Sequence, residues 1–239
     1  RDLVRSRGLG DVYKRQLLNV TLPRYGITTT FVDPDEVDNF SQAINKDTRA
    51  IYIESMGNPK LDVLDIEAIS KIANKAKLPL IVDNTVATPY LMKPISYGAN
   101  IVIQSTTKYI TGNGTSIGGA IIDAGNFDWS NGLFEEFTEP SPSYHGLKYH
   151  EALGPLAFIA KTRVEGLRDL GSAPSPLNSF QVIQGLETLE VRMQKHSDNA
   201  LKISKWLEEQ SEVSWVNYPG LNSSKYNQIA KKYLKKGKT

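Results

Sequence analysis

The 239-residue sequence contains no cysteine and only three histidines. Without cysteine the chain can form no disulfide, offers no thiol nucleophile and has no thiolate ligand for a metal. His145, His150 and His196 are scattered along the chain, so we expect no histidine metal site. Long apolar runs are also lacking, because no stretch approaches the roughly 18 to 20 residues that cross a membrane. We therefore expect a cytoplasmic protein with no membrane partner.

Basic residues concentrate at the two ends of the chain. Residues 1–16 hold five basic and two acidic side chains, whereas the remainder holds 23 basic and 24 acidic ones. From Lys225 onward six lysines occur with no acidic residue among them. Neither cluster contains a known recognition motif, so we interpret them as solvated charges and expect no nucleic-acid partner.

The first 16 residues, RDLVRSRGLGDVYKRQ, show neither helical nor strand periodicity and lack the apolar core of a signal peptide. They resemble a translated adaptor sequence, with a disordered basic arm as the alternative, and we expect folded sequence to begin near Leu17. Residues 226–236 read as a lysine-rich helix that stops without a closing element. We expect three parts: a non-native leader (1–16), a large domain cut at its N-terminal end (17–187), and the beginning of a C-terminal domain (188–239).

Apolar strands alternate with helices through the first half of the chain. Strands are predicted at 27–32, 50–54, 78–82, 101–104 and 120–122, with helices from Pro34 to about residue 44 and at 66–76. Continuous apolar strands separated by helices indicate a mostly parallel sheet covered on both faces. The expected fold class is α/β.

The second half of the chain has a different texture. Prolines punctuate residues 127–177, which predicts a long and partly irregular excursion. Helical spacing returns over 180–209 and predicts one long connector helix. A strand at 213–217 would then open a smaller second domain.

Polar residues follow three of the predicted strands, at the edge where parallel sheets bind ligands. Pyridoxal 5′-phosphate (PLP) needs a lysine amine, a carboxylate against its pyridine nitrogen, and hydroxyl donors for its phosphate. Lys108, Asp83, and Ser105 with Thr107 would supply these groups. Each also has a structural interpretation: Asp83 as a helix cap, the hydroxyls as turn formers, and Lys108 as a surface charge.

Two long motifs, IESMGNPKLDVLDIEAI and IVDNTVATPYLMKPISYGANIVIQSTTKYITGNGTSIGG, resemble the Cys/Met-metabolism PLP enzymes, which include cystathionine synthases and lyases, methionine γ-lyase and O-acetylhomoserine sulfhydrylases. The resemblance continues through PSYHG, SPLNSF, QGLETLEVRM and WVNYPGL and covers residues 17–221. It implies an aspartate aminotransferase-like large domain (fold type I) and a smaller α+β C-terminal domain. TLPRYGITTTFVD and PSYHG look most like the sulfhydrylases.

The resemblance also implies residue roles. Lys108 would be the Schiff-base lysine and later a proton shuttle, Asp83 would face the pyridinium nitrogen, and Asn58 would lie beside the ring hydroxyl. Ser105 and Thr107 would bind the phosphate. Where the family commonly has Gly-His-Gly after the lysine, this chain has an asparagine, Asn113, between the two glycines, so that side chain's role does not carry over.

The implied activity is conversion of O-acetyl-L-homoserine and sulfide, or another thiol, to homocysteine and acetate in methionine biosynthesis. Cystathionine γ-synthase, cystathionine γ-lyase and methionine γ-lyase activities are the alternatives, and an inactive fragment is the alternative outside enzymology. We expect the parent protein to form a homodimer or homotetramer. This chain itself is expected to be inactive, because the family's ring-stacking tyrosine and its substrate-carboxylate arginine have no counterpart in residues 1–239.

Overall fold

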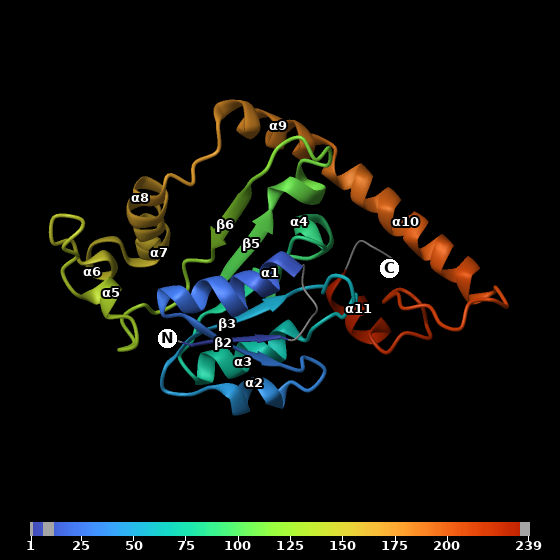
Figure 1. The fold of residues 1–239 in the computed structure, drawn as a ribbon, viewed down its shortest axis with the longest axis horizontal. Coiled ribbons are helices and arrows are strands. Elements are labelled where there is room, and N and C mark those ends of the chain that lie inside the picture. The colour runs from blue at the N-terminus through green and yellow to red at the C-terminus, as the bar shows by residue number, and fades with distance from the viewer. Residues whose placement is uncertain (1, 7–11, 235–239) are drawn as a thin grey trace.

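The computed structural model describes residues 2–6 and 12–234 (Figure 1). In this part of the chain a six-stranded sheet has the order β2-β1-β3-β4-β5-β6. Strands β1 to β5 run parallel, and β6 pairs antiparallel with β5. The strands span Asp2–Ser6 (β1), Thr28–Val32 (β2), Thr48–Glu54 (β3), Leu80–Asp83 (β4), Ile101–Ser105 (β5) and Gly119–Asp123 (β6). The expected α/β class with a mostly parallel sheet is confirmed.

The helix at Ile66–Lys75 (α3) shows how the sequence covers this sheet. Asp65 caps its N-terminus by accepting a hydrogen bond from Ala68 N at 3.0 Å. Its apolar residues recur at helical spacing, and Ile66, Ile69 and Ala73 are fully buried against the sheet core. The other predicted helix starts later than Pro34: α2 spans Asp38–Ala43, and Asp33 and Asp35 form a turn before it.

The expectation that folded sequence begins near Leu17 is wrong for the described residues. β1 lies between β2 and β3, and its Val4 is fully buried. A short helix at Val12–Gln16 (α1) follows and continues into helical turns at Leu17–Thr21 and Leu22–Tyr25. Five residues are too few to show periodicity, and this strand is stabilised by neighbours paired on both sides rather than by its own propensities.

The long helix predicted over 180–209 is broken into α9 (Pro176–Glu187) and α10 (Leu189–Glu208). Thr188, at the junction, has non-helical dihedral angles of φ −107° and ψ 3°. The strand predicted at 213–217 is wrong, because these residues have no regular structure. They run past the loop after β3, where Asn217 Nδ2 donates to Lys60 O at 2.5 Å, and no described strand pairs with them.

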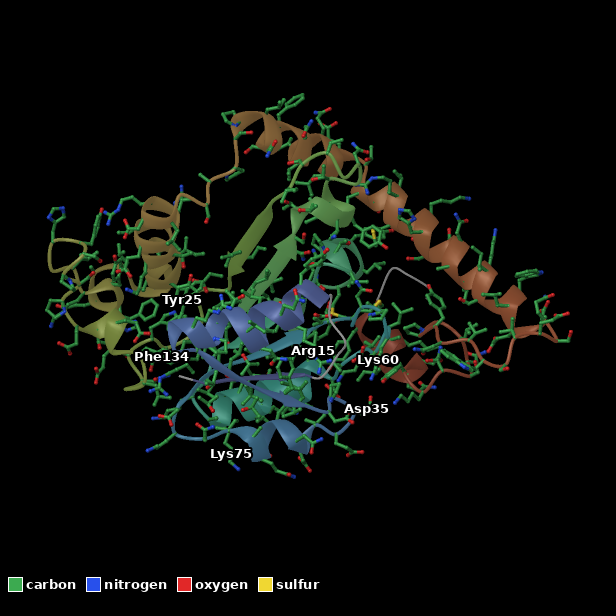
Figure 2. The ribbon with its side chains drawn as sticks, viewed as in Figure 1. Arg15, Tyr25, Asp35, Lys60, Lys75 and Phe134 are labelled. Carbon is green, nitrogen blue, oxygen red and sulfur yellow. The ribbon has the colours of Figure 1, made fainter. Side chains whose placement is uncertain are left out.

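The end of the described chain packs back on the large sheet domain. Asp35 accepts hydrogen bonds from Lys225 Nζ at 2.6 Å and from Tyr226 Oη at 2.7 Å. Figure 2 shows Asp35 and Lys60 on this side of the molecule, beside the helix Asn227–Tyr233 (α11). The limits of the expected parts, at 16/17 and 187/188, stay predictions.

Residues 127–170, which we call the aromatic segment, form a separate group of short helices at one side of the sheet (Figure 1). The helices are α5 (Glu135–Thr138), α6 (Tyr149–Leu153), α7 (Ala157–Lys161), a turn at Thr162–Leu167 and α8 (Arg168–Leu170). Trp129 stacks on Phe137 and Phe158, with ring centroids 4.3 and 5.2 Å away. None of the helices in the described ranges is long and apolar enough to cross a membrane.

Candidate active site

The five predicted site residues line one cavity of about 720 Å³ at the carboxyl edge of the parallel strands. Asn58 lies in the loop after β3, Asp83 ends β4 and Ser105 ends β5. Thr107 and Lys108 belong to the helical turn Thr106–Ile110, which starts directly after β5. The register of parallel strands therefore brings together residues that are 50 positions apart in the sequence.

The Asp83 carboxylate accepts four hydrogen bonds at the wall of this cavity. One carboxylate oxygen accepts from Thr85 N at 3.0 Å and from Thr85 Oγ1 at 2.6 Å. The other accepts from Tyr52 Oη at 3.0 Å and from Lys14 Nζ at 2.6 Å. With 7% of its surface exposed, the carboxylate is buried, and such a group needs these donors.

Lys14, from α1, joins Asp83 to a second buried carboxylate. Its ammonium lies 2.8 Å from Glu54 Oε1, and Glu54 is 6% exposed. Burial alone lowers the pKa of Lys14, but the two carboxylates outweigh it and raise that pKa above its ordinary value. Burial likewise raises the pKa of Asp83, and Lys14 with Thr85 outweighs it and holds the pKa below its ordinary value. Both groups are therefore charged at neutral pH.

Hydroxyl groups connect Asp83 to the end of β5. Thr85 Oγ1, which donates to Asp83, also accepts from Ser105 N at 2.8 Å. Thr107 Oγ1 accepts from Gly118 N at 3.0 Å and donates to Gly118 O at 3.2 Å, which ties the lysine turn to the strand beyond it. Thr85 thus links the Asp83 carboxylate to the end of β5, and Thr107 separately fixes the lysine turn against Gly118.

Lys108 is exposed, as is Tyr109 beside it, whereas Thr106 and Ile110 at the two ends of the turn are buried. The backbone of Lys108 leaves the helical region, at φ −88° and ψ −121°. The next two glycines that line the cavity, Gly112 and Gly114, have φ values of +79° and +67°, which favour glycine. Asn113 between them is exposed and does not line the cavity.

Several lining residues were missed by sequence reasoning. Lys14 lies in the stretch that we interpreted as a non-native leader. Its proximity to Glu54 and Asp83 could not be recognised from the sequence, because it depends on the fold. Thr85 follows Asp83 directly, and the Asp-Asn-Thr sequence could have indicated it. Arg192 and His196, one helical turn apart on α10, also line the cavity, and they follow the helix break at Thr188.

The groups around this cavity fit PLP. They combine one exposed primary amine with an ionised, buried carboxylate that already pairs with a cation, and with hydroxyls at the end of a strand. A protonated pyridine nitrogen would compete with Lys14 for Asp83. Within the described ranges, no three His, Cys, Asp or Glu side chains lie together as a metal site would require.

This sheet, with its lysine turn after β5, is the large-domain fold of the PLP-dependent enzymes of fold type I. The chain belongs to the family of Cys/Met metabolism PLP-dependent enzymes, whose pattern matches residues 9–239.

Relatives and solved structures agree with this assignment. An O-acetyl-L-homoserine sulfhydrylase of Leptospira meyeri is 51% identical, over 99% of this chain and 55% of its own length. A homocysteine synthase of Schizosaccharomyces pombe is 48% identical, over 92% of this chain and 52% of its own. This chain thus spans about half the length of these curated relatives.

One solved structure superimposes with a TM-score of 0.94 at 38% identity, over 98% of this chain and 59% of its own. It is a Campylobacter jejuni protein assigned as an O-acetylhomoserine (thiol)-lyase, and it contains a pyridoxyl-lysine monophosphate. An O-acetylhomoserine sulfhydrylase of Wolinella succinogenes gives a TM-score of 0.80 at 34% identity, over 99% of this chain and 64% of its own.

Proposed function

We propose that the protein containing this chain converts O-acetyl-L-homoserine and sulfide to L-homocysteine and acetate by a PLP-dependent γ-replacement. The observation that carries the proposal is the cavity in which Lys108 meets the ionised Asp83. The identity of 51% to an O-acetyl-L-homoserine sulfhydrylase supports this substrate over those of the related lyases and synthases.

The residues predicted from the sequence each have a role in this proposal. Bound PLP supplies an electron sink that stabilises carbanions next to the substrate amine. Asp83, which Lys14 and Thr85 hold ionised, would keep a positive charge on the pyridine nitrogen, and Thr85 orients its carboxylate. Lys108 Nζ would hold the cofactor covalently and would later carry protons between substrate carbons.

The remaining predicted residues would bind the edges of the cofactor. Ser105 ends β5 and Thr107 lies in the turn that follows, so their hydroxyls would suit a phosphate. Asn58, in the loop after β3, would lie beside the ring hydroxyl. For the whole protein we further infer a cytoplasmic location and a homodimer or homotetramer. Exposed apolar side chains on α9, such as Phe180 and Ile183 at 58% and 57% exposure, support an assembly.

Borohydride trapping tests the cofactor site. Residues 1–239 are treated with excess PLP and borohydride, and the labelled lysines are mapped by peptide mass spectrometry. We expect the label on Lys108, its loss in Lys108→Ala, and its retention in Lys71→Ala, which removes an exposed lysine of α3. Equal labelling of Lys108 and Lys71 would contradict the site.

Substrate assays on the whole protein test the reaction. O-acetylhomoserine with sulfide should give homocysteine faster than O-acetylhomoserine with cysteine gives cystathionine. Asp83→Asn should lower homocysteine formation by about 10²-fold, as expected for loss of a preorganised charged partner. Faster cystathionine formation would favour the sister activity instead.

A further inference from the structure

Arg192 joins three parts of the structure through hydrogen bonds to backbone oxygens. Its Nη1 donates to Tyr109 O at 2.7 Å, and its Nη2 donates to Ile110 O at 3.2 Å and to Gly185 O at 2.7 Å. Its Nε donates to Thr188 Oγ1 at 3.0 Å. One guanidinium therefore bridges the lysine turn, the end of α9 and the start of α10.

The same guanidinium is packed against the glycine that follows the lysine turn. A Cβ added to Gly112 would lie 2.6 Å from Arg192 Nη1 and 2.7 Å from its Cζ. Gly112 N also donates to Lys108 O at 2.9 Å, so this glycine closes the turn. Arg192 can reach its carbonyl partners only because no side chain intervenes there.

A second close contact joins α9 to the end of the turn. A Cβ added to Gly185, in α9, would lie 2.4 Å from Ile110 O and 2.5 Å from Thr111 O. These atoms belong to the backbone and cannot swing aside. The backbone of α9 at Gly185 thus packs directly against Ile110 and Thr111, which follow Lys108.

We propose that Arg192 and Gly185 are positioning residues that hold the Lys108 turn in place for cofactor binding. The inference rests on the proposed role of Lys108. Arg192 suits the task because a guanidinium presents five donors in a rigid fork, whereas a lysine ammonium is a point charge on a flexible stem. A displacement of about 1 Å in such a turn is enough to cost about 10²-fold in a positioned reaction.

Two measurements on residues 1–239 test the inference. Hydrogen–deuterium exchange without PLP follows the peptide covering 106–112, and borohydride trapping with PLP gives the ratio of label on Lys108 to label on Lys71. This ratio reports the selectivity of one lysine, so a uniform change in stability does not move it.

In Arg192→Gln we expect faster exchange of residues 106–112, unchanged exchange of β3 and β4, and a label ratio lowered by about tenfold or more. Arg192→Lys keeps the charge, and we expect its label ratio to be lowered as in Arg192→Gln. If Arg192→Gln does not fold, the label ratio of Arg192→Lys tests the positioning role instead. Arg163→Gln, at an exposed arginine outside the cavity lining, should behave as the unmodified chain.

Gly185→Ala is a second variant that keeps Arg192. Its added methyl group would clash with the backbone oxygens of Ile110 and Thr111 and so displace the turn. Its control is Gly166→Ala, where the nearest atom to the added Cβ is a methyl carbon of Thr162 at 3.9 Å. An unchanged ratio and unchanged exchange in both Arg192→Gln and Gly185→Ala would overturn the inference. If Lys108 of the unmodified chain is not labelled above Lys71, the proposed function fails, and the exchange of residues 106–112 alone decides the positioning role.

Discussion

The cavity wall and the aromatic segment hold their buried groups in opposite ways. At the cavity, Asp83 and Glu54 are buried as carboxylates and share one cation, Lys14. In the aromatic segment, Trp129 is buried among rings, with 5% of its surface exposed, and contributes apolar area. Buried charge is costly and weak evidence for stability, whereas buried aromatic area stabilises directly.

The one central carboxylate of the aromatic segment sharpens this contrast. Glu165 accepts hydrogen bonds from Lys161 Nζ at 2.6 Å, Ser143 Oγ at 3.1 Å and Tyr149 Oη at 3.3 Å. Its side chain keeps 30% of its surface exposed, whereas the side chains of Asp83 and Glu54 each keep 8%. The buried charges of the cavity are therefore available to a bound ligand. The aromatic segment instead contributes to stability through packing.

The largest expected effect is a loss of packing in the aromatic segment. Trp129→Ala should lower the free energy of unfolding by about 3–5 kcal/mol, because it removes stacked rings and leaves a cavity. Urea unfolding measures this change. Trp215→Ala is the matched control, since Trp215 is 79% exposed and its loss should change stability by about 0.5 kcal/mol or less. If Trp129→Ala and Trp215→Ala lowered the free energy of unfolding equally, aromatic packing would not be what stabilises the aromatic segment.

A smaller effect is expected at the cavity wall, where removal of Lys14 leaves two carboxylates buried without their cation. Lys14→Gln should lower the free energy of unfolding by about 2 kcal/mol. It should also increase PLP labelling of Lys108, because a competitor for Asp83 is gone. Arg15→Gln, at the exposed neighbour labelled in Figure 2, should change neither quantity. Weaker labelling in Lys14→Gln would show that Lys14 aids the cofactor.

The pH dependence of the Lys14 effect follows from the two pKa shifts. Asp83 has a lowered pKa, so its contribution is present above its ordinary pKa of 3.8 and is lost as the pH falls through the lowered value. Lys14 has a raised pKa, so its contribution persists up to 10.5 and is lost only at higher pH. The stability difference between the unmodified chain and Lys14→Gln should stay constant from about pH 5 to pH 9.

The same contrast explains what the sequence could predict. Runs such as AIYIE show the parallel strands, and polar residues after them indicated Asp83, Ser105 and Lys108 as neighbours. Contacts made by backbone oxygens leave no trace in periodicity, so the role of Arg192 and the helix break at Thr188 were missed. β1 and Lys14 were missed because a short strand between two partners depends on tertiary pairing. The strand predicted at 213–217 failed for the same reason, since propensity alone does not supply a partner.

The smallest expected effect is the loss of the Glu165 charge. Glu165→Gln should lower the free energy of unfolding by about 1 kcal/mol at neutral pH, because Lys161 and three hydroxyls, those of Ser141, Ser143 and Tyr149, lose an ionised acceptor. Burial raises the pKa of Glu165, but the bonds from Lys161 and the hydroxyls outweigh it and lower that pKa below its ordinary 4.5. The stabilisation is therefore complete above pH 4.5 and is lost as the pH falls through the lowered value. Urea unfolding at neutral and acidic pH measures the difference, which should shrink on acidification.

Glu151→Gln is the control, since that side chain is 77% exposed and lies 3.7 Å from its lysine partner. A Glu165→Gln effect as large as that of Lys14→Gln would mean that the aromatic segment also depends on buried charge.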